Sequence, residues 1–370
     1  MTLDIAPATK ADLIAEDPRD RGGPAQPMLI VERLKKYFPI HAGLLNRAVA
    51  QVKAVDDVSF FVLKGETLGI VGESGCGKST LARLLMHLMP RDAGNLVLDG
   101  DPVGEKLGVS LKGLRRSLQM VFQDSYSSLN PRLPIEESVA YGPRVQGETA
   151  KRAKQKARDL LEQVGLRPNL YGQRYPHELS GGQKQRVNIA RALALDPRLL
   201  ILDEAVSALD KSVEAQVLNL LQDLKERFNL TYIFISHDLH VVQYISDRVL
   251  VMYLGQVVEI GPVAEIYSNP KHPYTKALLE CRLSVDPEDR VEAAPLAGDP
   301  PNPVNPPSGC RFHPRCPFAE DVCAKAAPSL GNVLQAGADR HFAACHMVIP
   351  GSGHTHAPAP ALPRPEEPYR

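Results

Sequence analysis

The stretch "GESGCGKST", Gly72 to Thr80, decides the expected fold of the chain. It fits the pattern G-x-x-x-x-G-K-[ST], in which glycines let backbone N–H groups wrap a polyphosphate with no Cβ in the way. Lys78 is expected to bring positive charge to the β- and γ-phosphates, and Ser79 to offer its hydroxyl to Mg²⁺. The residues expected to bind nucleotide here are Gly72, Ser74, Gly75, Cys76, Gly77, Lys78, Ser79 and Thr80.

The flanking sequence supplies the strand and the helix that such a loop needs. "AVDDVSFFVLKGETLGIVGESG" predicts two strands joined by a Lys-Gly turn, the second leading into the loop. The helix predicted to follow would direct the positive end of its dipole at the phosphates. The loop, its strand and its helix together predict a nucleotide site.

A second apolar run, "LLILDE", ends in two carboxylates. Its apolar residues predict a buried strand with Asp203 at the carboxyl end, the edge where ligands bind in doubly wound sheets. Asp203 is expected to orient Mg²⁺, and Glu204 to polarise the attacking water. An Asp-Glu pair in a solvated loop is the alternative, and the phosphate loop disfavours it.

The wider pattern predicts an α/β chain of more than one domain. Helical spacing of apolar residues occurs at 149–164 and after 212, between short apolar runs such as "TYIFISHD" that suit a sheet covered on both faces. "RVLVMYLGQVVEIG" predicts a hairpin turning at Gly255, and the proline-rich "DPPNPVNPPSG" predicts a linker or extended segment. The expected divisions are a disordered extension at 1–27, an ATPase domain at 28–262 with a helical subdomain at about 125–192, a C-terminal domain at 263–349 and a disordered tail at 350–370.

Composition excludes several classes of protein. The 370 residues are 44% hydrophobic and 23% charged, which are ordinary globular values. Lys plus Arg equals Asp plus Glu at 43 each, so no overall positive field would hold nucleic acid or an anionic bilayer. Neither a secretory signal nor a membrane span is apparent in the sequence, and we expect a cytosolic protein with reduced thiols.

Four further motifs carry a resemblance to a known family. They are "LSGGQKQRVNIARAL" at 179–193, Gln123 in "VFQD", "SALD" at 207–210 and His237 in "FISHD". Together with the phosphate loop and "LILDE", and in their order along the chain, these motifs resemble those of ABC-type ATPases. The resemblance implies a P-loop NTPase ABC cassette: a RecA-like mixed sheet core, an antiparallel β subdomain and an α-helical signature subdomain, here followed by a small cysteine-containing C-terminal domain.

The resemblance also implies roles for single residues. In this family the signature residues cap the γ-phosphate of ATP bound in the opposite subunit, so two cassettes clasp the nucleotide between them. Gln123 would contact the metal and sense the transporter, Glu204 would be the general base, and His237 would steady Glu204 and the γ-phosphate. Asp210 would belong to a loop that connects the two sites. The signature residues concerned here are Ser180, Gly181, Gly182 and Gln183.

Two details of the resemblance need comment. Adenine is expected to stack on an aromatic residue of "KKYFP", with Phe38 favoured over Tyr37. The family usually has proline after the catalytic glutamate, where this chain has Ala205. That change removes no chemical group, so we expect an active ATPase.

Other segments narrow the resemblance to one group of transporters. "VKAVDDVSF", "HPYTKALL" at 272–279 and "PPSGCRFHPRCPFAEDVC" resemble the ATP-binding subunits of oligopeptide and dipeptide importers, and "EAVSALD" favours the subunit called F. The implied partners are a second, related ABC ATPase subunit, two membrane permeases and an extracellular substrate-binding protein. The implied location is the cytoplasmic face of the membrane.

Alternatives to that function remain open. The family also includes importers of nickel and of oligosaccharides. A soluble ABC ATPase acting on nucleic acid and a module that only senses nucleotide are other classes. The zero net charge of the chain disfavours an ATPase that acts on nucleic acid, and the intact hydrolytic residues disfavour a module that only senses nucleotide.

Four of the six cysteines lie between residues 310 and 345. Cys310, Cys316, Cys323 and Cys345 are spaced C-x5-C-x6-C-x21-C. Four thiolates can hold Zn²⁺ or an iron–sulfur cluster, and the absence of tight C-x2-C pairs favours iron–sulfur. The resemblance agrees, because this segment of peptide-importer ATPases can carry a [4Fe–4S] cluster. Zinc stays an alternative, with His313, His341 and His346 as substitute ligands, and so does a domain that packs without metal.

Overall fold

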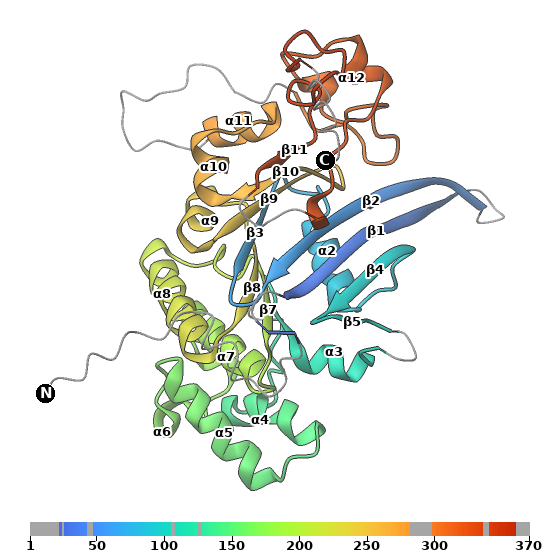
Figure 1. Ribbon diagram of the computed structural model, residues 1–370. Coiled ribbons are helices and arrows are strands. Elements are labelled where there is room, and N and C mark those ends of the chain that lie inside the picture. The colour runs from blue at the N-terminus through green and yellow to red at the C-terminus, as the bar shows by residue number, and fades with distance from the viewer. Residues whose placement is uncertain are drawn as a thin grey trace, which may run out of the picture.

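The computed structural model describes residues 22–23, 26–42, 47–104, 108–124, 127–281, 298–335 and 340–359. They form a large mixed sheet, a smaller antiparallel sheet, a helical arm and a C-terminal region (Figure 1). The predicted α/β fold class is confirmed. Within the described residues, no helix is long and apolar enough to cross a membrane.

The central sheet has seven strands in the order β11-β10-β9-β3-β8-β7-β6. The five strands from β9 to β6 run parallel, while β10 is antiparallel to both β9 and β11. The strand bounds are β3 Thr67–Val71, β6 Leu118–Val121, β7 Leu199–Asp203, β8 Thr231–Ile235, β9 Arg248–Tyr253, β10 Gln256–Pro262 and β11 Phe342–Ala343. Because β3 is flanked by β8 and β9, the loop that follows it lies near the centre of the sheet's carboxyl edge.

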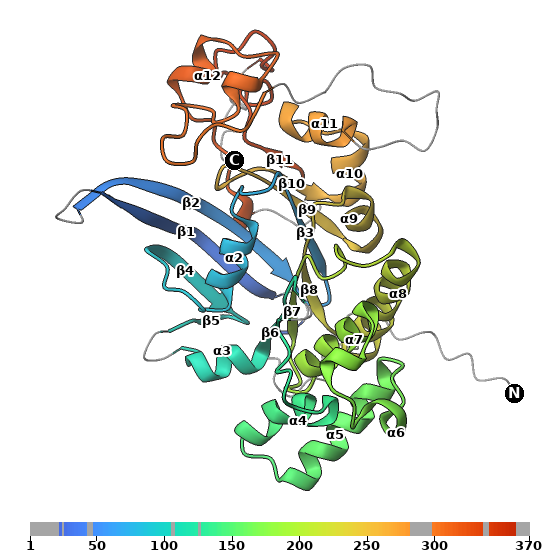
Figure 2. The same cartoon turned by 180° about the vertical axis from the view of Figure 1, so that it is seen from behind.

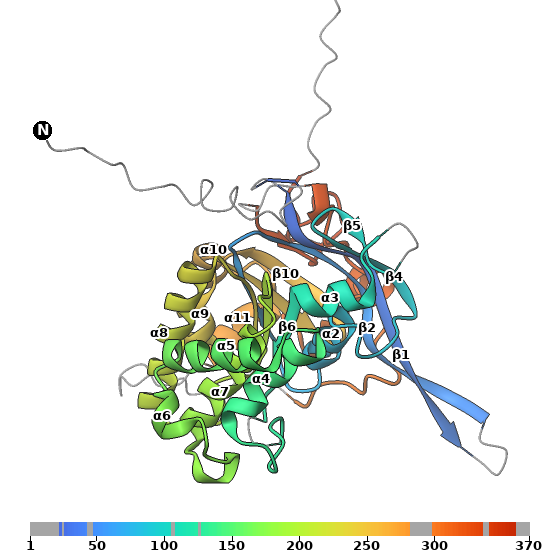
Figure 3. The same ribbon diagram turned by 90° about the horizontal axis from the view of Figure 1, so that it is seen from below.

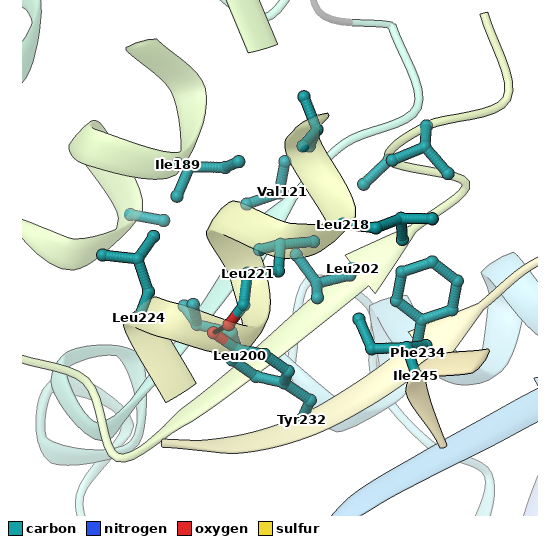
Figure 4. Close-up of a cluster of buried hydrophobic side chains, with 14 of the residues drawn as sticks. Val121, Ile189, Leu200, Leu202, Leu218, Leu221, Leu224, Tyr232, Phe234 and Ile245 are labelled. Atoms are coloured by element: carbon teal, nitrogen blue, oxygen red, sulfur yellow. Dashed lines mark hydrogen bonds between the residues drawn. The ribbon is translucent and has the colours of Figure 1, made fainter. Parts of the chain in front are cut away.

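The sheet is buried on both faces, as its continuous apolar strands require. Successive residues of a strand point to opposite faces, and Leu200 and Leu202 belong to one core while Leu199 and Ile201 belong to the other. The first core is covered by α7 Gly181–Leu193, α8 Lys211–Phe228 and α9 Leu239–Ile245. In Figure 4, Leu218, Leu221 and Leu224 of α8 pack over the strand residues of that face.

The second core is closed by α2 Lys78–Leu85 and by the antiparallel sheet. That sheet has the order β2-β1-β4-β5. Its strands are β1 Pro27–Ala42, β2 Arg47–Leu63, β4 Ala93–Leu98 and β5 Asp101–Pro102, and α3 Leu111–Ser117 follows them. Seen from behind and from below, the far ends of β1 and β2 project past the rest of the molecule (Figures 2 and 3).

The helical arm follows β6 and extends from one end of the sheet (Figure 1). It comprises α4 Ile135–Val145, α5 Ala150–Gln163, α6 Pro168–Tyr171, the 3₁₀ turn η1 Pro176–Glu178 and then α7. The apolar stripe predicted for 149–164 is buried at Ala153, Ala157, Leu160, Leu161 and Val164. The fully buried Glu136 of α4 is paired with Lys154 and Arg158 of α5, each at 3.0 Å, which fixes these two helices to each other.

The C-terminal region lies at the opposite end of the molecule from the helical arm (Figure 1). It contains α10 Val263–Ser268, α11 Pro273–Glu280, η3 His313–Arg315, α12 Asp321–Lys325 and η4 Val333–Gln335, and it returns to the sheet as β11. Phe312 is buried against Tyr253 and Tyr274, with ring centroids 5.4 Å from each. This region therefore packs directly on the cassette.

The ends of the chain differ from the prediction where they are described. The disordered tail predicted from residue 350 is wrong for residues 350–359, because the buried His354 bonds through its ring to the Phe318 carbonyl at 2.8 Å. Residues 360–370, and most of the extension predicted at 1–27, lie outside the described residues.

Candidate nucleotide site

The phosphate loop joins β3 to α2 in the conformation that its glycines allow. Gly77 has φ 110°, and a Cβ there would lie 2.2 Å from the Ala54 carbonyl oxygen. Gly72 is equally confined, since its Cβ would meet the Met252 oxygen at 2.2 Å. Neither position accepts a side chain without moving backbone, so the pattern of glycines is a steric requirement of this loop.

Lys78, the first residue of α2, bonds back to the start of the loop. Its Nζ donates to the carbonyl oxygens of Gly72 at 2.7 Å and Glu73 at 3.0 Å. The Cys76 thiol, 3.7 Å from that nitrogen, is buried, and burial raises its pKa. A neutral buried thiol packs rather than reacts.

Ser79 and Asp203 form the pair expected to hold a divalent cation. The Ser79 hydroxyl donates to Asp203 Oδ1 at 3.2 Å, which joins the loop to the end of β7. Burial raises the pKa of Asp203, the Ser79 hydrogen bond opposes that rise, and the neighbouring Glu204 carboxylate adds to it. A hydroxyl beside a carboxylate offers the oxygen ligands that Mg²⁺ prefers, so these residues fit the metal.

Glu204 is contacted by residues of two motifs that are distant in sequence. Gln123 Nε2 donates to Glu204 Oε2 at 2.6 Å, and His237 Nδ1 lies 3.5 Å from Glu204 Oε1. The Glu204 backbone is left-handed, with φ 48°, and its N–H donates to the Ile235 carbonyl of β8 at 2.9 Å. This sparsely populated conformation is held by the two adjoining strand ends and directs the carboxylate at the loop.

Lys78, Ser79, Gln123, Glu204 and His237 line one cavity of about 510 Å³. Asp203 lines a second cavity, which shares Ser79 and Gln123 with the first. The walls of the first cavity come from the phosphate loop, from β2, from the strand ends and from the C-terminal region. The lining residues are Val52, Lys53, Ala54, Ser74, Gly75, Gly77, Lys78, Ser79, Thr80, Gln123, Glu204, His237, Leu254, Gly255 and Pro303. The cavity thus gathers the predicted phosphate-binding, metal-binding and catalytic groups at one place.

The predicted adenine-stacking residues lie outside that lining, on β1 beside it. Tyr37 pairs with Lys53 and Phe38 with Val52, and both partners line the cavity. The Tyr37 hydroxyl donates to Asp56, and burial together with this bond raises the pKa of Tyr37 to about 12. Phe38 is partly exposed, and the choice between the two rings stays a prediction.

The signature residues also lie away from the cavity. Ser180 caps α7: its hydroxyl accepts from the Gln183 N–H at 3.4 Å, and the Gln183 side chain accepts from the Ser180 N–H at 3.0 Å. Ser180 and Gly181 are exposed at this helix start, whereas Gly182 is buried against Val213. Asp210 is exposed at the start of α8 with no capping bond of its own.

Comparison with known proteins identifies the family. The family model described as ABC transporter matches residues 55–207, and the one described as oligopeptide/dipeptide transporter, C-terminal region, matches residues 258–323. A probable peptide ABC transporter ATP-binding protein, y4tS of Sinorhizobium fredii, is 48% identical over 92% of this chain and 97% of its own length. The chain belongs to the ABC transporter family.

Further relatives agree with this assignment. The oligopeptide transport ATP-binding protein AppF of Bacillus subtilis is 49% identical over 86% of this chain and 97% of its own. The dipeptide transport ATP-binding protein DppF of Haemophilus influenzae is 48% identical over 82% and 93%. These ABC relatives are ATP-binding proteins, and ATP hydrolysis is the activity of this chain.

Solved ABC structures share the cassette. CbiO1 of Clostridium perfringens, part of an ABC transporter complex, has a TM-score of 0.56 and 26% identity, over 66% of this chain and 92% of its own. The ATP-binding cassette MJ0796, a dimer in a post-hydrolysis state with ADP and Pi, has a TM-score of 0.55 and 25% identity, over 64% and 99%. The predicted ABC cassette fold is confirmed.

The four C-terminal cysteines lie in one small part of this ABC protein. All are free thiols, and burial raises the pKa of Cys310 to about 11 and that of Cys345 to about 12. Among the described residues, which include all four, no three His, Cys, Asp or Glu side chains are placed to hold a metal ion. The [4Fe–4S] cluster and the zinc alternative therefore stay predictions from the sequence.

Sequence reasoning missed the contribution of the C-terminal region to the ATP site. Pro303 lines the cavity, and its carbonyl accepts from the Lys53 N–H at 3.3 Å. The Tyr274 hydroxyl accepts from the backbone N–H of Glu73 in the phosphate loop at 2.8 Å. No local pattern announces these contacts, since Tyr274 stands 201 residues from Glu73.

Proposed function

We propose that the chain is the F-type ATP-binding subunit of an importer of oligopeptides or dipeptides. The observation that carries the proposal is the Glu204 carboxylate, held between Gln123 and His237 beside the phosphate loop. A carboxylate so placed can accept a proton from the water that attacks the γ-phosphate. The printed names of the relatives, which speak of peptides, oligopeptides and dipeptides, support the cargo.

The residues of the cavity would divide the work of hydrolysis. When ATP binds, Lys78 Nζ would exchange its hydrogen bonds to the carbonyls of Gly72 and Glu73 for contacts with the phosphates. The N–H groups of the loop would surround those phosphates. Ser79 and Asp203 would hold Mg²⁺, which supplies charge neutralisation between the phosphates. Gln123 and His237 would keep the Glu204 carboxylate oriented while it accepts the proton.

A second cassette would complete each ATP site. The exposed Ser180 hydroxyl and helix start belong to no cavity with Lys78, and they are free to face a triphosphate on another subunit. The dimeric arrangement of the MJ0796 cassette supports such pairing. We expect the partner to be a related but different ABC subunit, giving a heterodimer.

The permeases would dock on a groove beside Gln123. A cavity of about 630 Å³ there is lined by Phe122, Gln123, Asp124, Ser127, Ser128, Tyr141 and Arg191, among others. Tyr141 is 61% exposed, and Phe122 and Val145 also present apolar surface to solvent. The loop "DSYSSLNPRLP" beside this groove would also contact the permeases, and its residues Ser125 and Tyr126 lie outside the described residues.

Docking of this kind would place the chain peripherally on the cytoplasmic face of the membrane. An extracellular binding protein would act on it only through the two permeases. Gln123 lies at the boundary of the groove and the ATP cavity, so a permease helix seated in the groove could move the group that holds Glu204.

The metal of the cysteine segment stays a prediction from sequence. The other three thiols lie near enough to Cys345 to contribute to its raised pKa. No group of three or more metal-ligating side chains is found among the described residues. Anaerobic purification followed by iron and sulfide analysis distinguishes the alternatives. Iron with acid-labile sulfide supports a [4Fe–4S] cluster, stoichiometric zinc supports the alternative ligand set, and neither supports packing without metal.

Co-purification and uptake test the proposed function. Tagged full-length chain should bring down two permeases and a second ABC subunit from detergent-solubilised membranes. A strain lacking the chain should lose uptake of labelled dipeptide or oligopeptide and recover it when the gene is restored. Loss of nickel or oligosaccharide uptake instead would reassign the cargo, and recovery of nucleic acid without permeases would contradict the importer function.

A further inference from the structure

The segment from Cys310 to Cys316, "CRFHPRC", crosses the ATP-binding half of the cassette. Phe312 fixes it there, with its ring perpendicular to Tyr253 and tilted against Tyr274. The two arginines of the segment bind carboxylates that lie next to lining residues of the nucleotide cavity, Glu73 beside Ser74 and Asp56 on β2. Both are buried, and each ends on a carboxylate of the cassette.

Arg315 grips the phosphate loop itself. Its guanidinium donates two hydrogen bonds to Glu73, Nη1 to Oε2 at 2.9 Å and Nη2 to Oε1 at 3.1 Å. The Arg315 side chain is 5% exposed and that of Glu73 22%. A bidentate pair of this geometry fixes the orientation of the carboxylate as well as its distance.

Glu73 in turn is the residue that Lys78 contacts. Its carbonyl accepts from Lys78 Nζ at 3.0 Å and from the Cys76 N–H at 3.2 Å, while its own N–H donates to the Tyr274 hydroxyl. Every polar group of Glu73 is therefore engaged, two of them by the C-terminal region and one by the loop. The Arg315 pair is separated from the phosphate-binding lysine by this single residue.

Arg311 contacts the β2 side of the site and the lining residue Leu254. Its guanidinium donates to Asp56 and to the Leu254 carbonyl, and Asp56 also accepts from the Tyr37 hydroxyl. Asp56 follows the cavity-lining residues Val52, Lys53 and Ala54 on β2. One short segment thus braces both the loop side and the β2 side of the site.

We infer that Arg315 is a positioning residue of the ATP site, which sets the affinity for nucleotide by holding Glu73 and so the phosphate loop. The C-terminal region is then part of the nucleotide-binding apparatus. This inference rests on ATP binding in the cavity described above, and it assigns no role to a metal.

Nucleotide binding by the full-length chain tests the inference. The probe is the fluorescent analogue MANT-ATP, with unlabelled ATP as competitor, and the variants are Arg315→Met and Arg315→Lys. Loss of the pair should raise the Kd about fivefold in Arg315→Met. Lysine supplies one point charge instead of a fork, so Arg315→Lys should recover part of the affinity.

The matched control is Lys325→Met, which breaks an exposed pair with Asp321 in the same region and should leave the Kd unchanged. In hydrolysis assays Arg315→Met should raise KM for ATP by a similar factor, with kcat at saturating ATP within about twofold of wild type. The double variant Arg315→Met with Glu73→Gln should bind no more weakly than Arg315→Met, since both changes remove one contact.

The outcomes distinguish ATP binding in the cavity from the positioning role of Arg315. Wild-type chain that fails to bind the probe would overturn ATP binding in this cavity, and the inference with it. A Kd for Arg315→Met equal to that of Lys325→Met overturns the inference alone. Should Arg315→Met fail to fold, Glu73→Gln decides: a raised Kd supports the inference, and an unchanged one overturns it.

Discussion

The cassette and the C-terminal region build the two sides of one cavity by different physical means. The cassette side rests on strands buried on both faces and on the backbone conformations of loop glycines and Glu204. Among the described residues from 298 to 359, the regular structure consists of 3₁₀ turns, the short helix α12 and the two-residue strand β11. This region is attached by arginine–carboxylate pairs and an aromatic cluster, so its side of the site depends on side chains rather than backbone.

The difference teaches which parts of a site tolerate substitution. A backbone-built loop changes little when a variable side chain such as Cys76 is replaced. A wall held by Arg311 and Arg315 loses its position when one guanidinium is removed, because the carboxylate left behind has no other partner of that geometry.

The largest effect is expected on the cassette side, at the general base. Glu204→Gln keeps the size of the side chain and removes the proton acceptor, so kcat should fall by about 10²–10⁴-fold while ATP still binds. The measurement is phosphate release by the assembled complex, with MANT-ATP binding alongside. Glu226→Gln, an exposed carboxylate of α8, is the control and should leave the rate unchanged. Undiminished hydrolysis in Glu204→Gln would contradict the assignment.

Truncating one buried side chain in the cassette and one in the C-terminal region should show whether the two regions unfold independently. Leu221→Ala removes a fully buried side chain of α8 and should cost about 2–5 kcal/mol of global stability. Phe312→Ala should open a cavity of similar cost, about 3–5 kcal/mol, but only where the C-terminal region meets the cassette.

Hydrogen exchange is the measurement for this pair of variants. Leu221→Ala should raise exchange throughout β7, β8 and α8, whereas Phe312→Ala should raise it from 298 to 359 and leave β7 protected. Equal loss of protection everywhere in both variants would show that the two regions unfold as one unit.

Acid should loosen the C-terminal side selectively. His272 is fully buried, and burial lowers its pKa to about 4, against the opposing influence of Glu259. The unfolded chain takes up a proton near pH 6.5 that the folded histidine resists, so stability present above pH 6.5 is lost as the pH falls towards 4. The loss is about 3 kcal/mol at most.

Denaturant unfolding at a series of pH values checks this expectation. His272→Gln removes the titrating group, so the difference between wild type and variant should change across that pH window and stay constant above it. A constant difference throughout would contradict the buried neutral histidine.

The smallest effect is expected for a purely local contact of the cassette. The Thr149 hydroxyl accepts from the Arg152 N–H at 3.4 Å and caps α5 in the helical arm. Thr149→Ala should cost about 1 kcal/mol, measured as a small fall in Tm. Thr149→Ser keeps the hydroxyl and should stay close to wild type.

The sequence predicted the cassette side well because its determinants are local. The phosphate loop needs glycines at fixed spacing, and an apolar run ending in Asp203 and Glu204 specifies a buried strand with its acids at the ligand edge. The strand and helix patterns therefore predicted the fold class and the Lys78, Ser79 and Glu204 cluster that the structure brings together.

The C-terminal side could not be predicted in the same way. Arg315 and Glu73 are 242 residues apart, and Arg311 and Asp56 are 255 apart, so no periodicity or motif links them. The cysteine spacing singles out the segment from Cys310 to Cys316. The residues of this segment that contact the cassette are the two arginines and Phe312, which lie between those cysteines. The same lack of a local signal holds for His354, whose ring bonds to the Phe318 carbonyl 36 residues away.

The two residues of β11 have a consequence for how the chain behaves when it is shortened. They pair with Glu259 and Ile260 of β10, and the Ala344 N–H adds a bond to the Val258 carbonyl at 2.8 Å. In a protein truncated before Phe342, β10 would become an edge strand with unpaired backbone N–H and C=O groups. Such an edge can pair with the same edge of another copy of the protein. The segment that contains β11 thus blocks pairing between the sheets of two molecules. A truncated form could aggregate through this edge even with its hydrophobic core intact.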